Sequence, residues 1–300
     1  MVSKEMEMVI NLLREYQASQ KEPSVEGART GLEQLASLTK LPEDVKCEPL
    51  DAGGVPAEWI TTPGVEDQYA ILYLHGGGYV AGSVKTHRDL ASRISRASKA
   101  RVLIIDYRLA PEHPFPAAVE DATAAYRWLV SAGGIDPSNL IVAGDSAGGG
   151  LTVASLVKLR DEGDALPAGA VCLSPWTDLA CTGETLKTKA EVDPFVTPEG
   201  IEFMARVYLG DADPRNPLAS PLYADLKGLP PMLIQVGTSE ILLDDSLRLA
   251  DRAKAAGVNV ELDVWEDMVH VFAAFAAFAP EGRQAIERIG EFVKKIFHRK

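Results

Sequence analysis

The sequence has few cysteines, no surplus of basic side chains and no long apolar run. Its three cysteines lack a Cys-x-x-Cys spacing, which argues against a disulfide framework or a zinc cage. The 30 basic and 43 acidic residues give a net charge of −13, so nucleic acid is not an expected partner. No stretch reaches the roughly 18 uncharged apolar residues of a membrane span, and charges interrupt the first 21 residues, unlike a signal peptide. We therefore expect a cytoplasmic chain without a membrane span.

The 300 residues, 46% of them hydrophobic, are enough for a large α/β core and contain no internal repeat. Short apolar runs alternate with helical patterns, and runs that are apolar on both faces predict a parallel sheet covered on both sides. The predicted strands are 69–74, 101–106, 140–143, 168–173, 232–236 and 258–265. The predicted helices are 86–98, 117–132, the segment after 146, 246–256 and 281–297.

Two segments depart from this alternation. The amino-terminal segment begins with an amphipathic helix, becomes weakly patterned over 22–41, and continues into a predicted hairpin of 45–50 with 55–61. The proline-rich segment 182–229 interrupts the βα order. Within it we predict one helix, which Thr197 caps and Gly210 ends.

The central stretch contains a tight turn. An apolar run at 140–143 leads into Gly-Asp-Ser-Ala-Gly at 144–148 and then into a helical pattern. A strand-to-helix turn of this kind leaves no room for side chains two residues from the serine, and Gly144 and Gly148 supply that room. It would present the Ser146 hydroxyl as a nucleophile at the positive end of a helix dipole. A simple packing turn would have the same pattern, so other residues must distinguish the two.

A second glycine cluster follows the predicted strand 69–74. Three consecutive glycines at a strand end let backbone N–H groups point at an incoming atom, as an oxyanion hole requires. The expected donors are Gly76, Gly77, Gly78 and Ala147. The segment 76–81 also fits the dinucleotide pattern G-x-G-x-x-[G/A]. That alternative is weakened because the predicted helix starts only near residue 86, and because Asp106 lies farther along than the usual ~20 residues.

Three sequence blocks, in this order, resemble the signature of the hormone-sensitive-lipase-like carboxylesterases. They are His-Gly-Gly-Gly at 75–78, Asp-Tyr-Arg-Leu-Ala-Pro-Glu at 106–112 and Gly-Asp-Ser-Ala-Gly-Gly at 144–149. The resemblance implies an α/β-hydrolase fold, with a mostly parallel central sheet, helices on both faces and a helical cap. It divides the chain into a cap segment 1–45, a catalytic domain 46–181 and 230–300, and a cap insertion 182–229.

The α/β-hydrolases place serine, acid and histidine in that order along the chain, so the base must follow Ser146. His270 is the candidate, since the other histidines precede the serine or lie in the basic tail. Matching the family's Asp-Pro-Leu-x-Asp block assigns the acid to Glu240, although this chain has Glu for Asp and Ile for Pro. The alternatives are Asp244 and Asp245, which we expect instead to cap the next helix.

These residues predict a serine carboxylesterase that acts through an acyl-Ser146 intermediate. The family resemblance implies short- to medium-chain esters as its substrates. Residues beside the motifs are expected to contact the substrate: Tyr79, Asp145, Pro175, Trp176 and Phe272. We expect a small ester as partner, require no metal or cofactor, and leave a homodimer open. The alternatives are a dinucleotide-binding enzyme and a small-ligand receptor that has lost catalysis. The receptor is less favoured because all three triad residues are present.

Overall fold

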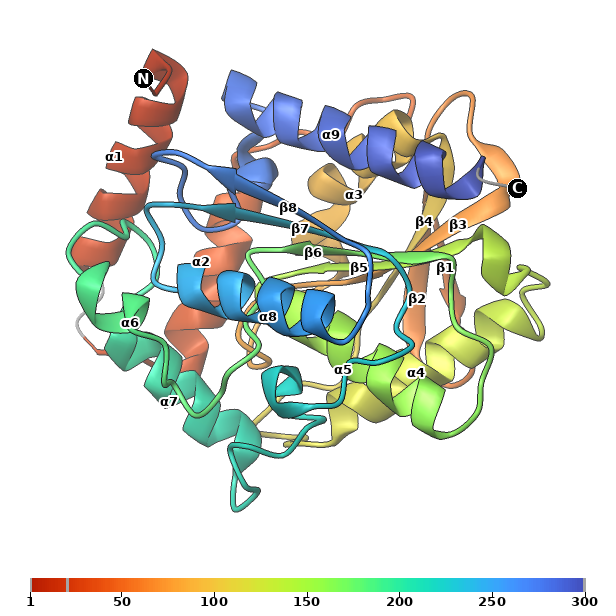
Figure 1. Cartoon of the computed structure of the whole chain (residues 1–300). Helices are drawn as coiled ribbons and strands as arrows, with labels where there is room; N and C mark the ends of the chain where they lie inside the picture. Colours follow the sequence, from red (N-terminus) through yellow and green to blue (C-terminus); the bar gives the residue numbers. More distant parts are fainter. Residues whose placement is uncertain (1, 20–21, 299–300) are drawn as a thin grey trace.

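The computed structural model describes residues 2–19 and 22–298, and within them one mixed sheet forms the centre of the molecule (Figure 1). The elements in chain order are α1 (Lys4–Ser19), α2 (Val25–Ser37), β1 (Lys46–Asp51), β2 (Pro56–Thr61), β3 (Glu66–Leu74), α3 (Val84–Ser98), β4 (Ala100–Ile105), α4 (Ala117–Val130), η1 (Pro137–Asn139), β5 (Leu140–Asp145), α5 (Ala147–Asp161), β6 (Gly169–Leu173), α6 (Thr185–Thr188), α7 (Pro198–Leu209), η2 (Pro221–Tyr223), β7 (Met232–Gly237), α8 (Leu243–Ala255), β8 (Val260–Trp265), η3 (Phe272–Phe275) and α9 (Pro280–Phe297).

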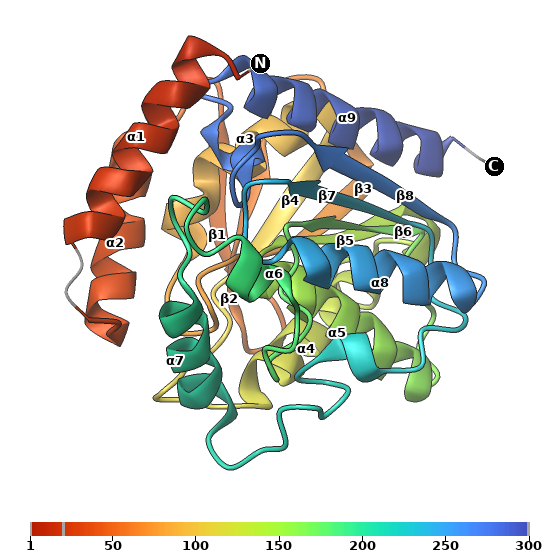
Figure 2. The same ribbon diagram turned by 60° about the vertical axis from the view of Figure 1, so that its left-hand side comes forward.

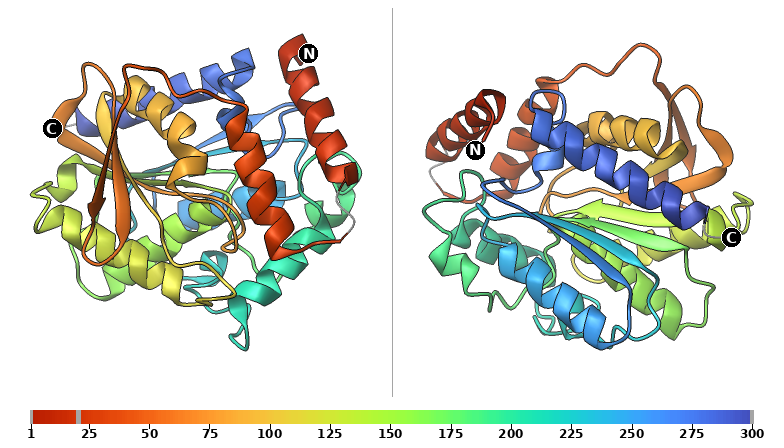
Figure 3. Two further views of the ribbon diagram at one scale, coloured as in Figure 1. Left: turned by 180° about the vertical axis from the view of Figure 1, so that it is seen from behind. Right: turned by 45° about the horizontal axis from the view of Figure 1, so that its top comes forward.

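The described sheet has eight strands in the order β1-β2-β4-β3-β5-β6-β7-β8. The pairs β1–β2 and β2–β4 are antiparallel, and every pair from β4 to β8 is parallel. Helices α3 and α9 cover one face, and α4, α5 and α8 cover the other (Figures 1 and 3). This arrangement is the α/β-hydrolase fold, and it confirms the predicted hairpin and the predicted parallel sheet.

Strand β3 shows why the strands are apolar on both faces. Leu72 and Leu74 belong to the core beneath α4 and α5, whereas Ile71 and Tyr73 belong to the core beneath α3 and α9. Successive side chains of a strand point to opposite faces, so a sheet covered on both sides buries all of them. The carboxyl ends of these strands are thereby held rigidly at one edge.

Helices α1, α2 and α7 gather at one side of the molecule (Figure 2). Helix α1 buries Met6, Val9 and Leu13, as its helical spacing predicted. Helix α7 begins after Thr197, whose side chain accepts the N–H of Gly200 at 3.1 Å, and ends at Gly210, as predicted. None of the helices in the described ranges has both the length and the uncharged apolar run that a bilayer crossing requires.

Three local predictions were wrong or incomplete. The segment 22–41 contains a full helix, α2, whose N-cap Ser24 accepts the N–H of Gly27. The short helix α6 was missed within 182–229. Helix α8 begins at Leu243, so Asp244 and Asp245 lie in its first turn instead of capping it. Its N-cap, Leu242, has no polar side chain to cap the helix, and the carboxylates of Asp244 and Asp245 accept N–H groups of other segments.

Candidate active site

Ser146 occupies the sharp turn between β5 and α5. Its backbone has φ of 53° and ψ of −120°, a strained conformation for a residue other than glycine. A Cβ on Gly144 would lie 2.3 Å from the carbonyl oxygen of Gly148, and a Cβ on Gly148 would lie 1.9 Å from that of Leu74. Both distances are far below van der Waals contact, so glycine is required at both positions, as the sequence predicted. The turn directs Ser146 into a cavity at the carboxyl ends of the strands.

The glycine loop after β3 faces the same cavity. Gly77 and Gly78 have φ of 116° and 62°, and both line the cavity beside Ser146. Among the described residues, neither of their N–H groups donates to a protein acceptor. Ala147 is the first residue of α5, where an N–H has no partner within the helix. These three N–H groups are available to an oxyanion.

Gly76 differs from the prediction, because its N–H donates to Oδ1 of Asp145 at 3.1 Å. It is therefore engaged in positioning the loop and is not a free donor. The same carboxylate oxygen accepts the hydroxyl of Tyr73 at 2.8 Å. His75 supports the loop base, where its Nδ1 lies 2.8 Å from the Gly76 carbonyl oxygen. Burial lowers the pKa of His75 to about 3, so its ring is neutral.

Glu240 and His270 meet across two loops at the end of the sheet. Nδ1 of His270 lies 2.7 Å from Oε2 of Glu240, and both side chains are buried. Burial alone lowers the pKa of His270, but the hydrogen bond and charge of Glu240, with the further charge of Asp193, outweigh it and raise the pKa. His270 lines the cavity together with Ser146. The loop that follows β7 thus holds a carboxylate that orients a buried imidazole.

The two alternative acids are engaged elsewhere. Oδ2 of Asp245 accepts the N–H groups of Thr177 and Asp178 at 2.7 and 2.8 Å, and burial raises the pKa of this carboxyl to about 7. Asp244 accepts the N–H of Thr185 at 3.1 Å. Both carboxylates tie the 174–185 segment to α8 and neither is hydrogen-bonded to His270.

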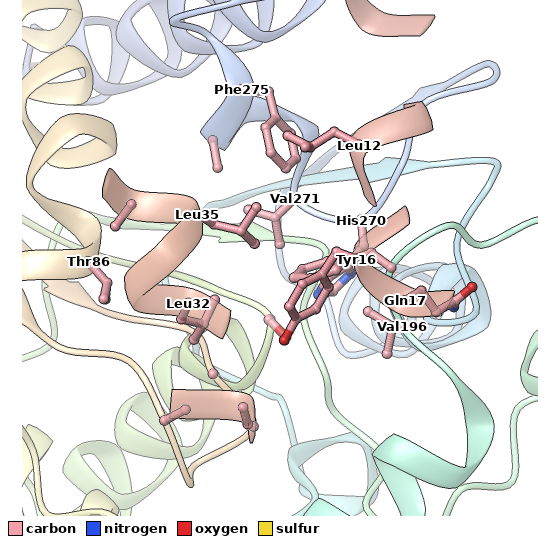
Figure 4. Close-up of a pocket in the computed structure, with 18 of the residues that line it drawn as sticks. Leu12, Tyr16, Gln17, Leu32, Leu35, Thr86, Val196, His270, Val271 and Phe275 are labelled. Atoms are coloured by element: carbon pink, nitrogen blue, oxygen red, sulfur yellow. The ribbon is translucent and has the colours of Figure 1, made fainter. Parts of the chain in front are cut away.

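The cavity has a volume of about 1280 Å³, and among the helices α1, α2, α3 and α7 contribute most to its wall. Leu12 and Leu32 point into it from the two amino-terminal helices, and Phe275 closes it near the His270 loop (Figure 4). The charged side chains that line the cavity are acidic. Apart from two histidines, they are all Asp or Glu, and within the described residues no Lys or Arg contributes to the wall. These acids are Glu5, Glu15, Glu22, Asp89, Asp145 and Glu199.

Of the residues predicted to contact substrate, Asp145 lines the cavity and the other four do not. Tyr79 is buried and stacks on Tyr208 of α7, with ring centroids 3.8 Å apart. Trp176 is fully buried beside Tyr79. Phe272 packs against Trp265 at 5.2 Å, in the core beneath α9. These aromatic side chains fix the wall from behind.

Pro175 also lies behind the site, so close to Gly149 that a Cβ added to this glycine would lie within 3 Å of the proline. The cavity-lining residues of α1 and α2 were not predicted. Ala28, Leu32 and Leu35 recur at helical spacing, which indicates an apolar helix face but not that this face lines a cavity. Among the described residues there is no group of three or more His, Cys, Asp or Glu side chains placed to hold a metal ion.

A family model described as the alpha/beta hydrolase fold matches residues 71–274. An acetyl-hydrolase of Streptomyces hygroscopicus is 45% identical over 98% of this chain and 97% of its own. An esterase of Acinetobacter venetianus is 36% identical over 89% of this chain and 88% of its own. Among solved structures, an esterase from the bacterial hormone-sensitive lipase family is 54% identical, with a TM-score of 0.95 over 98% of this chain and 99% of that one. EstE5, soaked with p-nitrophenyl butyrate, is 50% identical with a TM-score of 0.93 over 98% and 99%.

Proposed function

Because the chain belongs to the hormone-sensitive-lipase-like carboxylesterases of the α/β-hydrolase fold, we propose that Ser146, Glu240 and His270 carry out its ester hydrolysis. The observation that carries the assignment is the 2.7 Å contact between His270 and Glu240 beside the cavity that Ser146 enters. Serine esterases need a nucleophile, a base and a group that orients the base. These three residues supply that set in the chain order of the fold.

In this mechanism, Nε2 of His270 removes the hydroxyl proton as Oγ of Ser146 attacks the ester carbonyl carbon. The carbonyl oxygen becomes an oxyanion, which accepts the N–H groups of Gly77, Gly78 and Ala147. Collapse of the tetrahedral intermediate breaks the ester bond, and His270 gives its proton to the departing alcohol. Water then attacks the acyl carbonyl carbon as His270 removes its proton. Collapse of this second tetrahedral intermediate breaks the bond to Oγ of Ser146, which regains the proton from His270 as the carboxylic acid leaves.

The test compares single alanine variants on p-nitrophenyl butyrate. Ser146→Ala and His270→Ala should each lower kcat by up to about 10⁶-fold, because triad residues act as a unit. The kcat of Glu240→Ala should also fall strongly, though by less than that of the Ser146 and His270 variants. Asp244→Ala should keep most of its activity. An inactive Asp244→Ala beside an active Glu240→Ala would move the acid to Asp244.

We further propose esters with short to medium acyl chains as substrates. The apolar side chains of the cavity wall suit an acyl chain. One relative is named an acetyl-hydrolase, and the crystals of another, EstE5, were soaked with p-nitrophenyl butyrate. A series of p-nitrophenyl esters from acetate to palmitate tests this range. Peak kcat/KM at palmitate would contradict it.

The segments 1–45 and 182–229 are proposed to act as the cap, since together they supply most of the residues that line the cavity. A homodimer is proposed through the outer edge of β8, which is the last strand of the described sheet and exposes Val264. Light scattering of the purified protein, with Val264→Lys as the comparison, tests it.

A cytoplasmic location is also proposed, because Cys47, Cys172 and Cys181 are free thiols, as a reducing compartment maintains them. Cell fractionation tests it. The two alternative functions are not favoured. Relatives along nearly the whole chain are named as hydrolases and esterases, and the segment 76–81 leads into a turn and a Ser83 cap before α3, not directly into a helix that could hold a pyrophosphate.

A further inference from the structure

The catalytic acid has two carboxylate oxygens, and the histidine uses one of them. The other, Oε1 of Glu240, accepts the hydroxyl of Ser174 at 2.7 Å and the N–H of Gly237 at 2.7 Å. Glu240 has no solvent-exposed surface. The orientation of this carboxylate is therefore set by protein groups alone.

Ser174 reaches this position from the end of β6, on a backbone that is itself constrained. Its φ is 43°, in the left-handed region that favours glycine, and its N–H donates to the carbonyl of Gln235 at 2.7 Å. A serine held in a conformation better suited to glycine implies that its side chain has a use.

The same hydroxyl has a second contact. Oγ of Ser174 accepts the N–H of Val271 at 3.0 Å, and Val271 directly follows the histidine. Val271 has φ of 50°, an outlier for a β-branched side chain, so this loop needs external support. A single buried hydroxyl thus donates to the acid and accepts from the loop that carries the base.

We propose that Ser174 is a positioning residue that locks the carboxylate of Glu240 to the backbone beside His270. The inference rests on the function proposed above. Glutamate has one more rotatable bond than aspartate, so its carboxylate needs a further contact to hold one plane.

Two variants remove the hydroxyl in different ways. Ser174→Ala removes it and keeps the backbone strain, whereas Ser174→Gly removes it and relieves that strain, since glycine adopts positive φ freely. Ser155→Ala is the matched control, because the Ser155 hydroxyl is equally buried and makes no hydrogen bond within the described residues. Titration with diethyl p-nitrophenyl phosphate, which labels the nucleophile, counts the folded sites in each preparation.

Both Ser174 variants should lose about 10- to 100-fold in kcat per titrated site, the range for a hydrogen bond to a charged group. Their KM for p-nitrophenyl butyrate should change less than about twofold. The acid limb of kcat/KM should move to higher pH, because a carboxylate with fewer donors holds the imidazolium more strongly. Ser155→Ala should match the wild type in all three measurements.

Wild-type kcat and pH profile in both Ser174 variants would overturn the proposal, as would a loss confined to Ser174→Ala, which would assign the effect to the backbone. Ser146→Ala separates the two levels of inference. If it is inactive while the Ser174 variants are normal, the esterase assignment stands and the positioning role falls. If it is active, the triad itself is wrong.

Discussion

Gly148→Ala tests whether the close approach of the elbow to β3 is needed for both folding and catalysis. The new Cβ would lie 1.9 Å from the carbonyl oxygen of Leu74 and 2.6 Å from that of His75. Both acceptors are backbone atoms, so no side-chain rotation relieves the clash. Such overpacking costs about 3 kcal/mol, at the upper end of its usual range. Alanine returns at most about 1 kcal/mol as the better helix former.

The net loss of about 2 kcal/mol corresponds to a fall in Tm of roughly 3 °C, because a chain of 300 residues has an unfolding entropy of about 0.6 kcal/mol/K. Activity should fall further, because relieving the clash moves the glycine loop relative to Ser146, and a displacement of about 1 Å costs on the order of 10²-fold. Differential scanning calorimetry and kcat/KM on p-nitrophenyl butyrate measure the two effects. The control is Gly200→Ala, in which the nearest neighbour of the new Cβ would be the side-chain oxygen of Thr197 at 3.1 Å. This variant should keep or raise Tm. Wild-type Tm and kcat/KM in Gly148→Ala would refute the reasoning.

Two further predictions follow from the charges at the site. The raised pKa of His270 places the acid limb of kcat/KM above the ordinary value of 6.5, with activity lost as pH falls through it; a limb below pH 6 would contradict this. By linkage, the pair of His270 and Glu240 stabilises the fold most below pH 6.5, and this stabilisation is lost as the pH rises through the raised pKa of His270. A series of Tm values against pH should show this dependence in the wild type, and His270→Asn should abolish it. The acidic cavity wall, without Lys or Arg in its described lining, should repel anionic esters. The hemisuccinate ester of p-nitrophenol should therefore have a kcat/KM well below that of the pentanoate, with the gap narrowing at high salt, and equal values would show that the wall charge has no effect.

The glycine turn, the glycine loop and the position of the histidine could be predicted because each depends on a local rule. Gly144 and Gly148 are dictated by backbone contacts within the turn, and His270 follows from chain order. The prediction of Glu240 as the acid rests partly on a wrong expectation, since Asp244 and Asp245 do not cap α8. Their engagement with residues of the 174–185 segment depends on tertiary contacts that the local sequence does not encode.

The cavity wall could not be predicted for a different reason. An apolar stripe on a helix has the same spacing whether it packs into a core or faces a cavity, so Leu12 and Leu32 had no distinguishing signal. Proximity to a motif was equally uninformative. Tyr79 is next to the glycine loop in sequence, yet its ring turns away and stacks on Tyr208.

Asp193 links two parts that the domain division treats as separate. Its Oδ1 accepts the N–H groups of Phe195 and Val196, which line the cavity, each at 2.9 Å. Its Oδ2 accepts the N–H of Ile241, also at 2.9 Å. Ile241 directly follows Glu240, so one buried carboxylate joins the proposed cap insertion to the loop of Glu240.

This link has an electrostatic side as well as a mechanical one. Burial raises the pKa of Asp193 to about 6, and its negative charge is among the causes that raise the pKa of His270. A residue of the proposed cap insertion therefore contributes to the basicity of His270. The same carboxylate holds the backbone beside Glu240. Asp193 thus joins the proposed cap to the proposed triad, although the two are far apart in sequence and only the triad has a sequence signature.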